Sequence, residues 1–143
     1  MTITICAMGE LLAEFLSRNP HQKFTQPGEF IGPFPSVAPA ILAAQVAKLS
    51  HRAIFFGCVG NDDFGRLIIE RLRHEGVITD GIHVMNNAVT GTAFVSYQNP
   101  QQRDFVFNIP NSACGLLPST LIRICLNSVT ICILWAHRCS HFA

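Results

Sequence analysis

The sequence predicts an α/β fold with a wound sheet, in which parallel strands are covered by helices. The observations behind this prediction lie in residues 34–76, where helix, strand and helix signals follow one another without conflict. Ala53–Phe56 is apolar without alternation, which is typical of a parallel strand that is covered on both faces. A buried strand between two helices favours a wound sheet over a helical bundle or a β-sandwich.

The first helix of this stretch is expected to begin near Pro39, because a proline in the first turn of a helix loses no hydrogen bond. Its apolar face is predicted from Leu42, Val46 and Leu49, which recur at helical spacing. The strand Ala53–Phe56 follows, and we expect it to end at residues 57–60.

The second helix has clear ends. Asn61 or Asp62 can cap its N-terminus, where Asp62 and Asp63 also place favourable negative charge. Gly76 supplies the left-handed residue that ends it. We expect basic residues in the last turn and an apolar stripe against the strand, namely Arg71, Arg73 and His74, and Phe64, Leu67, Ile68 and Leu72.

Further strands are predicted on both sides of this stretch. Ile3–Met8 alternates and ends in Gly9-Glu10, which suits a first sheet strand. Thr90–Tyr97 and Arg103–Asn108 are rich in strand-forming residues, and the turn between them predicts a hairpin. Residues 19–35 are rich in proline, glycine and polar side chains, so composition alone predicts a surface loop there.

Composition and charge exclude several classes of function. The 143 residues carry a net charge of +1 with 13% charged residues, so we expect no nucleic acid as a partner. No apolar run approaches the roughly 18 residues that a membrane span needs, so we expect no membrane partner. The start lacks the basic region of a signal peptide, and we therefore expect a cytoplasmic protein.

Six cysteines in such a chain indicate buried thiols rather than disulfides. Cys58, just after the buried strand, is expected to be a small core residue. A metal cluster can be imagined from Cys125, Cys132, Cys139, His137 and His141. The sequence contains no C-x-x-C pair, so we assign no metal ligand.

A family resemblance rests on the same central stretch. Residues 57–65, GCVGNDDFG, resemble the G-x-V-G-x-D-x-x-G segment of the ribokinase-like (PfkB) carbohydrate kinases. Residues 38–40 and 48–49 resemble that family's G-G-A-P-A-N…L-G element. The resemblance implies that residues 1–117 are the N-terminal sugar-binding part of a ribokinase-like kinase. It also implies a small β-lid, built from segments at about 12–35 and 90–110.

The resemblance further implies five residues that bind substrate. Glu14 occupies the position of an aspartate that hydrogen-bonds sugar hydroxyls, and Arg103 a position from which some members reach substrate. Ser36 and Val37 stand where the family carries Gly-Gly, and Ile41 where it carries a sugar-binding asparagine. An exposed strand-end role for Glu14 and a solvated Arg103 are the alternatives.

These departures bear on activity. A β-branched valine does not easily reproduce the backbone angles of glycine, and isoleucine cannot replace the hydrogen bonds of asparagine. Ser50 also replaces the glycine expected after the first helix. Together the substitutions suggest an altered substrate or relaxed selection.

The residues for phosphoryl transfer are missing from this sequence. The reaction needs a base, donors for the developing phosphate charge and a nucleotide site with Mg²⁺. The family supplies these in a late D-T-x-G-A-G-D segment, whereas this chain has no acidic residue after Asp104. We therefore assign no catalytic or cofactor-binding residue, although ATP and Mg²⁺ are implied for the full-length family.

The resulting prediction is a truncated PfkB-type sugar kinase. Its parent activity is ATP-dependent phosphorylation of a sugar hydroxyl, and this chain is expected to be inactive. A second hypothesis is a non-catalytic module that binds sugar or forms a homodimer through its lid strands. A third is a degraded gene product without function.

Residues 118–143 differ from the rest in composition, without a consistent strand or helix period. We interpret them as a shifted reading frame of the kinase gene. One permitted choice of codons for Asn127 to Ala143, read two bases later, spells QCNHLHIMGSSLFSFR. That string resembles the family's next buried strand and Gly-Ser turn. The sheet is then expected to lack the strands that normally follow.

Overall fold

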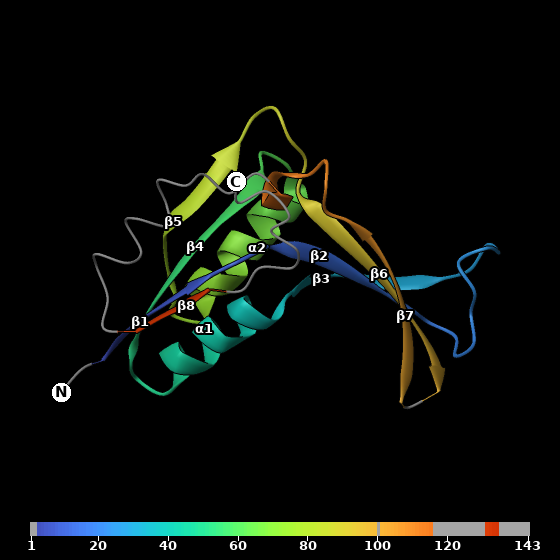
Figure 1. The fold of residues 1–143 in the computed structure, drawn as a ribbon, viewed down its shortest axis with the longest axis horizontal. Coiled ribbons are helices and arrows are strands. Elements are labelled where there is room, and N and C mark those ends of the chain that lie inside the picture. The colour runs from blue at the N-terminus through green and yellow to red at the C-terminus, as the bar shows by residue number, and fades with distance from the viewer. Residues whose placement is uncertain (1–2, 100, 116–130, 135–143) are drawn as a thin grey trace.

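The computed structural model describes residues 3–99, 101–115 and 131–134 (Figure 1). Its elements form a body with helices and a second sheet that extends to one side of it. In chain order they are β1 (Thr4–Met8), β2 (Leu12–Ser17), β3 (Phe30–Ser36), α1 (Ala38–Lys48), β4 (Arg52–Gly60), α2 (Asp63–His74), β5 (Ile78–Met85), β6 (Gly91–Asn99), β7 (Gln102–Asn108), η1 (Ala113–Gly115) and β8 (Ile131–Leu134).

The body contains a parallel sheet with the strand order β5-β4-β1-β8. Ala7 of β1 pairs with Phe55 of β4, and both side chains are buried in the main core. Cys58 of β4 is also fully buried, as predicted. Cys6 of β1 is disulfide-bonded, so the expectation of thiols rather than disulfides is wrong at that position. The wound α/β sheet expected from the sequence is confirmed, and the predicted central strand is longer than Ala53–Phe56.

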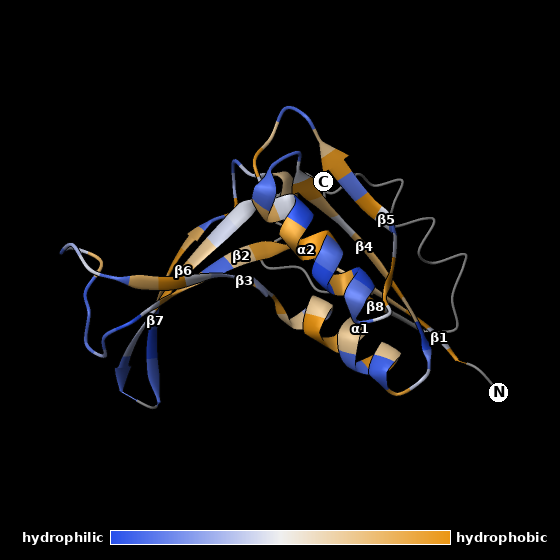
Figure 2. Ribbon diagram, turned by 180° about the vertical axis from the view of Figure 1, so that it is seen from behind, coloured by the Kyte–Doolittle hydropathy of each residue, from blue (hydrophilic) through white to orange (hydrophobic). Residues whose placement is uncertain are grey.

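Helix α2 buries the expected part of its stripe. Ile68 and Leu72 lie in the core that contains Phe55, and Figure 2 shows hydrophobic and hydrophilic residues alternating along this helix. Phe64 was predicted to pack against the central strand, β4, with Ile68 and Leu72. Its ring instead contacts Phe15 of β2 edge to face, with the ring centroids 5.6 Å apart. The second sheet lies against the first turn of α2, so the Phe64 side chain packs on that sheet.

The predicted apolar face of α1 is only partly right. Val46 is buried, but Leu49 is 72% exposed. The helix instead buries its small residues, among them Ala43 and Ala44. Short side chains let a helix approach a sheet closely, so position in the fold rather than hydrophobicity decides which face is buried here.

The second sheet, which we call the lid sheet, has the strand order β3-β2-β6-β7. Strands β2 and β6 are parallel, and the outer strands pair antiparallel to them. The prediction of a surface loop from composition is wrong for Phe30–Ser36, which forms β3. Pro33 and Pro35 are tolerated because β3 is an edge strand, where fewer backbone N–H groups must donate.

Both helices end in the same way. After α1, the N–H of Ser50 donates to Ala47 O (3.0 Å) and the N–H of His51 to Val46 O (3.2 Å). After α2, Gly76 and the following residue make the equivalent bonds to Arg73 O and Leu72 O. This pattern places one left-handed residue after each helix. Ser50 has φ 63° and Gly76 has φ 84°, so the predicted stop at Gly76 is confirmed.

One expectation about the tail is wrong. Residues Ile131–Leu134 form β8 and pair in parallel with β1, so the body sheet gains a strand that we expected it to lack. A run of four apolar residues is too short for periodicity to distinguish a strand from a helix. The other residues of the 118–143 tail, with the imagined cluster of Cys125, Cys139, His137 and His141, lie outside the described part of the chain.

Within the described residues, no helix is long and apolar enough to cross a membrane.

Candidate functional site

Two of the predicted substrate-binding residues share a face of the lid sheet. Glu14 of β2 pairs with Phe34 of β3 and with Ala93 of β6. Ser36 pairs with Leu12, two residues before Glu14 on β2. Because side chains two residues apart on a strand, and those paired across strands, point the same way, Glu14 and Ser36 face the same side. We call this side the Glu14 face.

Val37 follows directly and precedes α1. Its backbone has φ 128° and ψ 138°, which is a region that residues other than glycine adopt only under strain. Its half-buried side chain packs against a cluster that contains Leu12, Ala93 and Cys114. The expectation that glycine suits this position is supported, and an apolar side chain fills the space that glycine would leave.

Ile41 lies one turn into α1 and is 55% exposed. Together with Ser36 it lines a cavity of about 120 Å³ between the end of β3 and helices α1 and α2. Charged residues at the end of this cavity form a network, in which Lys48 Nζ lies 2.9 Å from Glu75 Oε2 and Arg71 also contacts Glu75. Hydrogen bonds from Lys48 and Arg71 lower the pKa of the Glu75 carboxyl. The cavity brings Ser36 and Ile41 together, but Glu14 does not line it.

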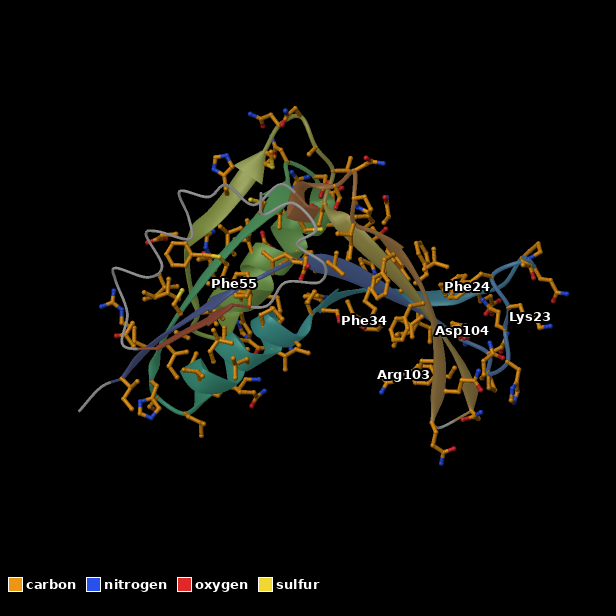
Figure 3. All side chains as sticks on the ribbon, in the orientation of Figure 1. Lys23, Phe24, Phe34, Phe55, Arg103 and Asp104 are labelled. Carbon is orange, nitrogen blue, oxygen red and sulfur yellow. The ribbon has the colours of Figure 1, made fainter. Side chains whose placement is uncertain are left out.

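Arg103 is not brought to the other predicted residues. It pairs with Tyr97 across β6 and β7, and its guanidinium carbon lies 5.6 Å from the centre of the Tyr97 ring. It shares the Glu14 face, but Tyr97 is four residues beyond Ala93 on β6, which is about 13 Å along a strand. Figure 3 shows Arg103 and Phe34 on the lid sheet, away from Phe55 in the body.

A second group of polar contacts lies where the lid sheet joins the body. Asp62 caps α2, since its Oδ1 accepts the N–H of Gly65 at 2.8 Å. The same carboxylate accepts the N–H and the hydroxyl of Thr90, each at 2.7 Å. The Thr90 Oγ1 in turn accepts the N–H of Gly60 at 2.9 Å. We call these four residues the Asp62 junction.

The junction depends on the glycines of the G-x-x-G-x-x-x-x-G segment. A Cβ on Gly60 would lie 2.6 Å from Thr90 N, and one on Gly65 would collide with the carbonyl oxygen of Gly60. Burial alone would raise the pKa of the Asp62 carboxyl, but hydrogen bonds from Thr90 and Gly65 outweigh burial and lower it. The sequence predicted only the capping role of Asp62. The Thr-Gly pair that begins the predicted strand at 90–97 was an available signal for Thr90.

Two buried thiols lie near the carboxyl end of β4. Burial raises the pKa of Cys58 to about 11, and electrostatic repulsion by the Cys114 thiolate, once that group ionises, is the smaller cause. Burial also raises the pKa of Cys114, whose Sγ lies 2.9 Å from the Ser112 hydroxyl oxygen. Both cysteines are therefore protonated near neutral pH and are poor nucleophiles. Within the described residues, no group of three or more His, Cys, Asp or Glu side chains could hold a metal ion.

Comparisons with known proteins agree with this arrangement. The family model of the pfkB family carbohydrate kinases matches residues 39–122. Probable fructokinase-5 of Arabidopsis thaliana is 32% identical over 116 residues, which cover 81% of this chain and 36% of the relative. Fructokinase-2 of Solanum habrochaites is 34% identical over 113 residues, which cover 79% of this chain and 34% of the relative. The chain thus spans about a third of the length of these relatives.

Solved structures give the same result. A protein assigned as ribokinase II from E. coli, in its apo form, is 41% identical with a TM-score of 0.85, covering 94% of this chain and 43% of that one. Fructokinase from Xylella fastidiosa is 32% identical with a TM-score of 0.72, covering 85% of this chain and 37% of that one. Because the family model matches more than half of the residues of this chain, the chain belongs to the pfkB family of carbohydrate kinases.

Proposed function

We propose that this chain is the sugar-binding part of a carbohydrate kinase whose full-length form phosphorylates a sugar hydroxyl with ATP. The observation that carries the proposal is the position of Glu14 and Ser36 on one face of the lid sheet. They lie between the end of β1 and the start of α1. In wound sheets, ligands bind at the carboxyl ends of the strands, and β1 leads into the lid sheet at that end.

The chemistry of this face suits a sugar. A carboxylate such as that of Glu14 can accept two hydroxyl hydrogen bonds, and such charge-assisted bonds are the strong ones. An exposed apolar side chain beside it, that of Phe34, which pairs with Glu14 and is 41% exposed, can pack against the carbon face of the ring. The relatives are named fructokinases and ribokinase II, so fructose and ribose are the sugars to test first.

Binding can be measured by calorimetry of the full 143-residue chain with fructose or ribose. Glu14→Ala should weaken the affinity at least about tenfold, because it removes a charged hydrogen-bond acceptor. Glu29→Ala is the matched control, since Glu29 is an exposed carboxylate that pairs with Arg18 beyond β2. Equal effects of the two substitutions, or no heat with either sugar, would contradict the proposed site.

We also propose that this chain alone does not transfer the phosphoryl group. No acidic residue follows Asp104, and no segment of the sequence resembles D-T-x-G-A-G-D. Loss of either the base or the anion site reduces such reactions by orders of magnitude. The assay is ADP formation with and without sugar. Sugar-dependent turnover by a sample free of contaminating kinase would refute this part.

A second candidate function is dimerisation through the lid sheet. The Glu14 face carries large apolar side chains in solvent, of which Phe34 is 41% and Phe105 is 45% exposed. Phe105 pairs with Val95 of β6, which lies two residues after Ala93, the partner of Glu14. The side chain of Phe105 is therefore on the Glu14 face. Such a patch on a soluble protein often marks an interface. A second copy with the same patch could cover it.

Sedimentation equilibrium tests this candidate. Phe105→Ser should shift the chain from dimer to monomer. Val106→Ser should leave the dimer intact, because Val106 is similarly exposed, at 47%, on the opposite face of β7. A monomer at every concentration, or equal effects of both substitutions, would contradict dimerisation through this face. Aggregation without sugar binding would instead support a degraded gene product.

A further inference from the structure

Asp62 makes more hydrogen bonds than a helix cap requires. A capping aspartate needs to accept only one or two N–H groups from its own helix. Asp62 does so through Gly65, and it also receives both donors of Thr90, which lies 28 residues later in the chain. The bonds to Thr90 connect the start of α2 with the start of β6, a connection that helix capping does not require.

Thr90 is the residue from which the lid sheet leaves the body on this side. It is 1% exposed and immediately precedes β6. Its Oγ1 also accepts the N–H of Gly60, the last residue of β4. The Asp62 junction therefore fixes the start of β6 to the end of a body strand and to the first turn of a body helix.

Strand β6 controls the position of the lid sheet. It lies between β2 and β7 and runs from the body toward the end of the lid sheet (Figure 1). Its residue Ala93, three positions after Thr90, pairs with Glu14. A displacement at Thr90 is thus transmitted through a short stretch of paired strand to the Glu14 face.

We propose that Asp62 is a positioning residue that holds the lid sheet, and with it Glu14, at a fixed place on the body. It does so through the two bonds to Thr90, in addition to capping α2. The consequence for sugar affinity rests on the proposed function. The structural part does not, because the lid sheet is held in this way whether or not a sugar binds.

Hydrogen exchange of the full chain without sugar tests the structural part. Local opening of the lid sheet should become easier in Asp62→Ala, so the amides of β6 and β7 should exchange at least about tenfold faster. The amides of β4 before Gly60, and those of β5, should change by less than about twofold, since their hydrogen bonds do not involve the junction. Asp63→Asn is the matched control and should leave both groups unchanged. Asp63 has the same charge one position later, but it contacts Arg66 within its own helix.

Thr90→Val provides the second variant, because it keeps the cap of α2 and removes only the hydroxyl. It should produce the same selective acceleration in β6 and β7. Uniform acceleration across body and lid sheet in the two variants would show a general stabilising role and overturn the proposal. So would an unchanged lid sheet, a response of Asp63→Asn equal to that of Asp62→Ala, or failure of both variants to fold.

Calorimetry with fructose or ribose separates this inference from the proposed function. If the parent chain binds sugar, Asp62→Ala should weaken the affinity, while Asp63→Asn should not. Selective exchange with no sugar binding in the parent chain would refute the proposed function and leave the positioning role intact. Sugar binding in the parent chain without selective exchange in the variants would refute the positioning role alone.

Discussion

Replacing Ser50 by glycine should stabilise the protein. Ser50 follows α1 with φ 63°, in the left-handed region, and its N–H and that of His51 bond back to the last turn. A residue with a Cβ loses about 1–2 kcal/mol in this conformation. Ser50 is exposed, so little packing is lost with its side chain. The only opposing effect is the greater freedom of glycine in the unfolded chain.

The magnitude follows from these opposing contributions. Greater freedom of the unfolded chain offsets roughly 0.4–1 kcal/mol of the relief. The net gain for Ser50→Gly should therefore be roughly 0.5–1 kcal/mol. The reverse change can be made after α2, where Gly76 has φ 84°. A Cβ at Gly76 would meet only Ala47 Cβ at 3.7 Å, so Gly76→Ser should lose a similar amount through conformation alone.

Urea unfolding of the full chain measures both changes. The midpoint should rise for Ser50→Gly and fall for Gly76→Ser, with an unchanged slope. Ser50→Ala keeps the Cβ and should stay within about 0.5 kcal/mol of the parent chain. If Ser50→Gly instead lowers the free energy of unfolding by the usual glycine penalty, the left-handed geometry at this helix end is wrong.

Three further predictions concern stability. Ile68→Ala should lower the free energy of unfolding by roughly 2–5 kcal/mol, because Ile68 is 1% exposed; exposed Ile41→Ala is the control in the same urea titration. Val37→Gly should be more stable than Val37→Ala by roughly 0.5–2 kcal/mol, because only glycine relieves the strain at φ 128°; the usual order, with alanine more stable, would refute that strain. The free energy of unfolding should decrease as the pH is lowered below about 4.5, the ordinary pKa of Glu75. Asp62 and Glu75 have lowered pKa values in the folded chain, so in acid the two carboxylates take up protons when the chain unfolds. Glu75→Gln should flatten this loss in acid titrations followed by circular dichroism, and an unchanged profile would contradict it.

The ends of α2 could be predicted because they depend on local chemistry. Asp62 caps the helix through a residue three positions away, and Gly76 ends it within the next turn. The central strand was equally predictable, since an unbroken apolar run is a local signal. These features require no knowledge of which strands are neighbours.

The features that the sequence did not predict depend on distant pairing. Phe64 is apolar and correctly spaced, but it meets Phe15 because the lid sheet lies against the first turn of α2. The second role of Asp62 involves Thr90, 28 residues away. Family resemblance suggested Arg103 as a substrate contact, but the register of β6 and β7 places it beside Tyr97, well away from Glu14.

Strand β8 does not decide whether the tail is read in a shifted frame. Ile131–Leu134 is apolar in the given frame and pairs with Ile5 to Met8. With the chosen codons, the same bases read in the other frame give H-L-H-I-M, which also contains apolar residues at strand spacing. A short parallel strand beside β1 is compatible with both, because four paired residues require little beyond apolar side chains.

The gene sequence therefore provides the decisive measurement for the tail. If the frame is shifted after Leu117, the bases beyond that codon should encode, in the shifted frame, a continuation that leads to a D-T-x-G-A-G-D segment. That segment would supply the base and the anion site to which we assigned no residue among the present 143. Restoring the frame should then produce sugar-dependent ADP formation in a chain that contains the same Glu14 face. A gene without such a downstream frame would end this interpretation and leave residues 118–143 as a native part of the protein.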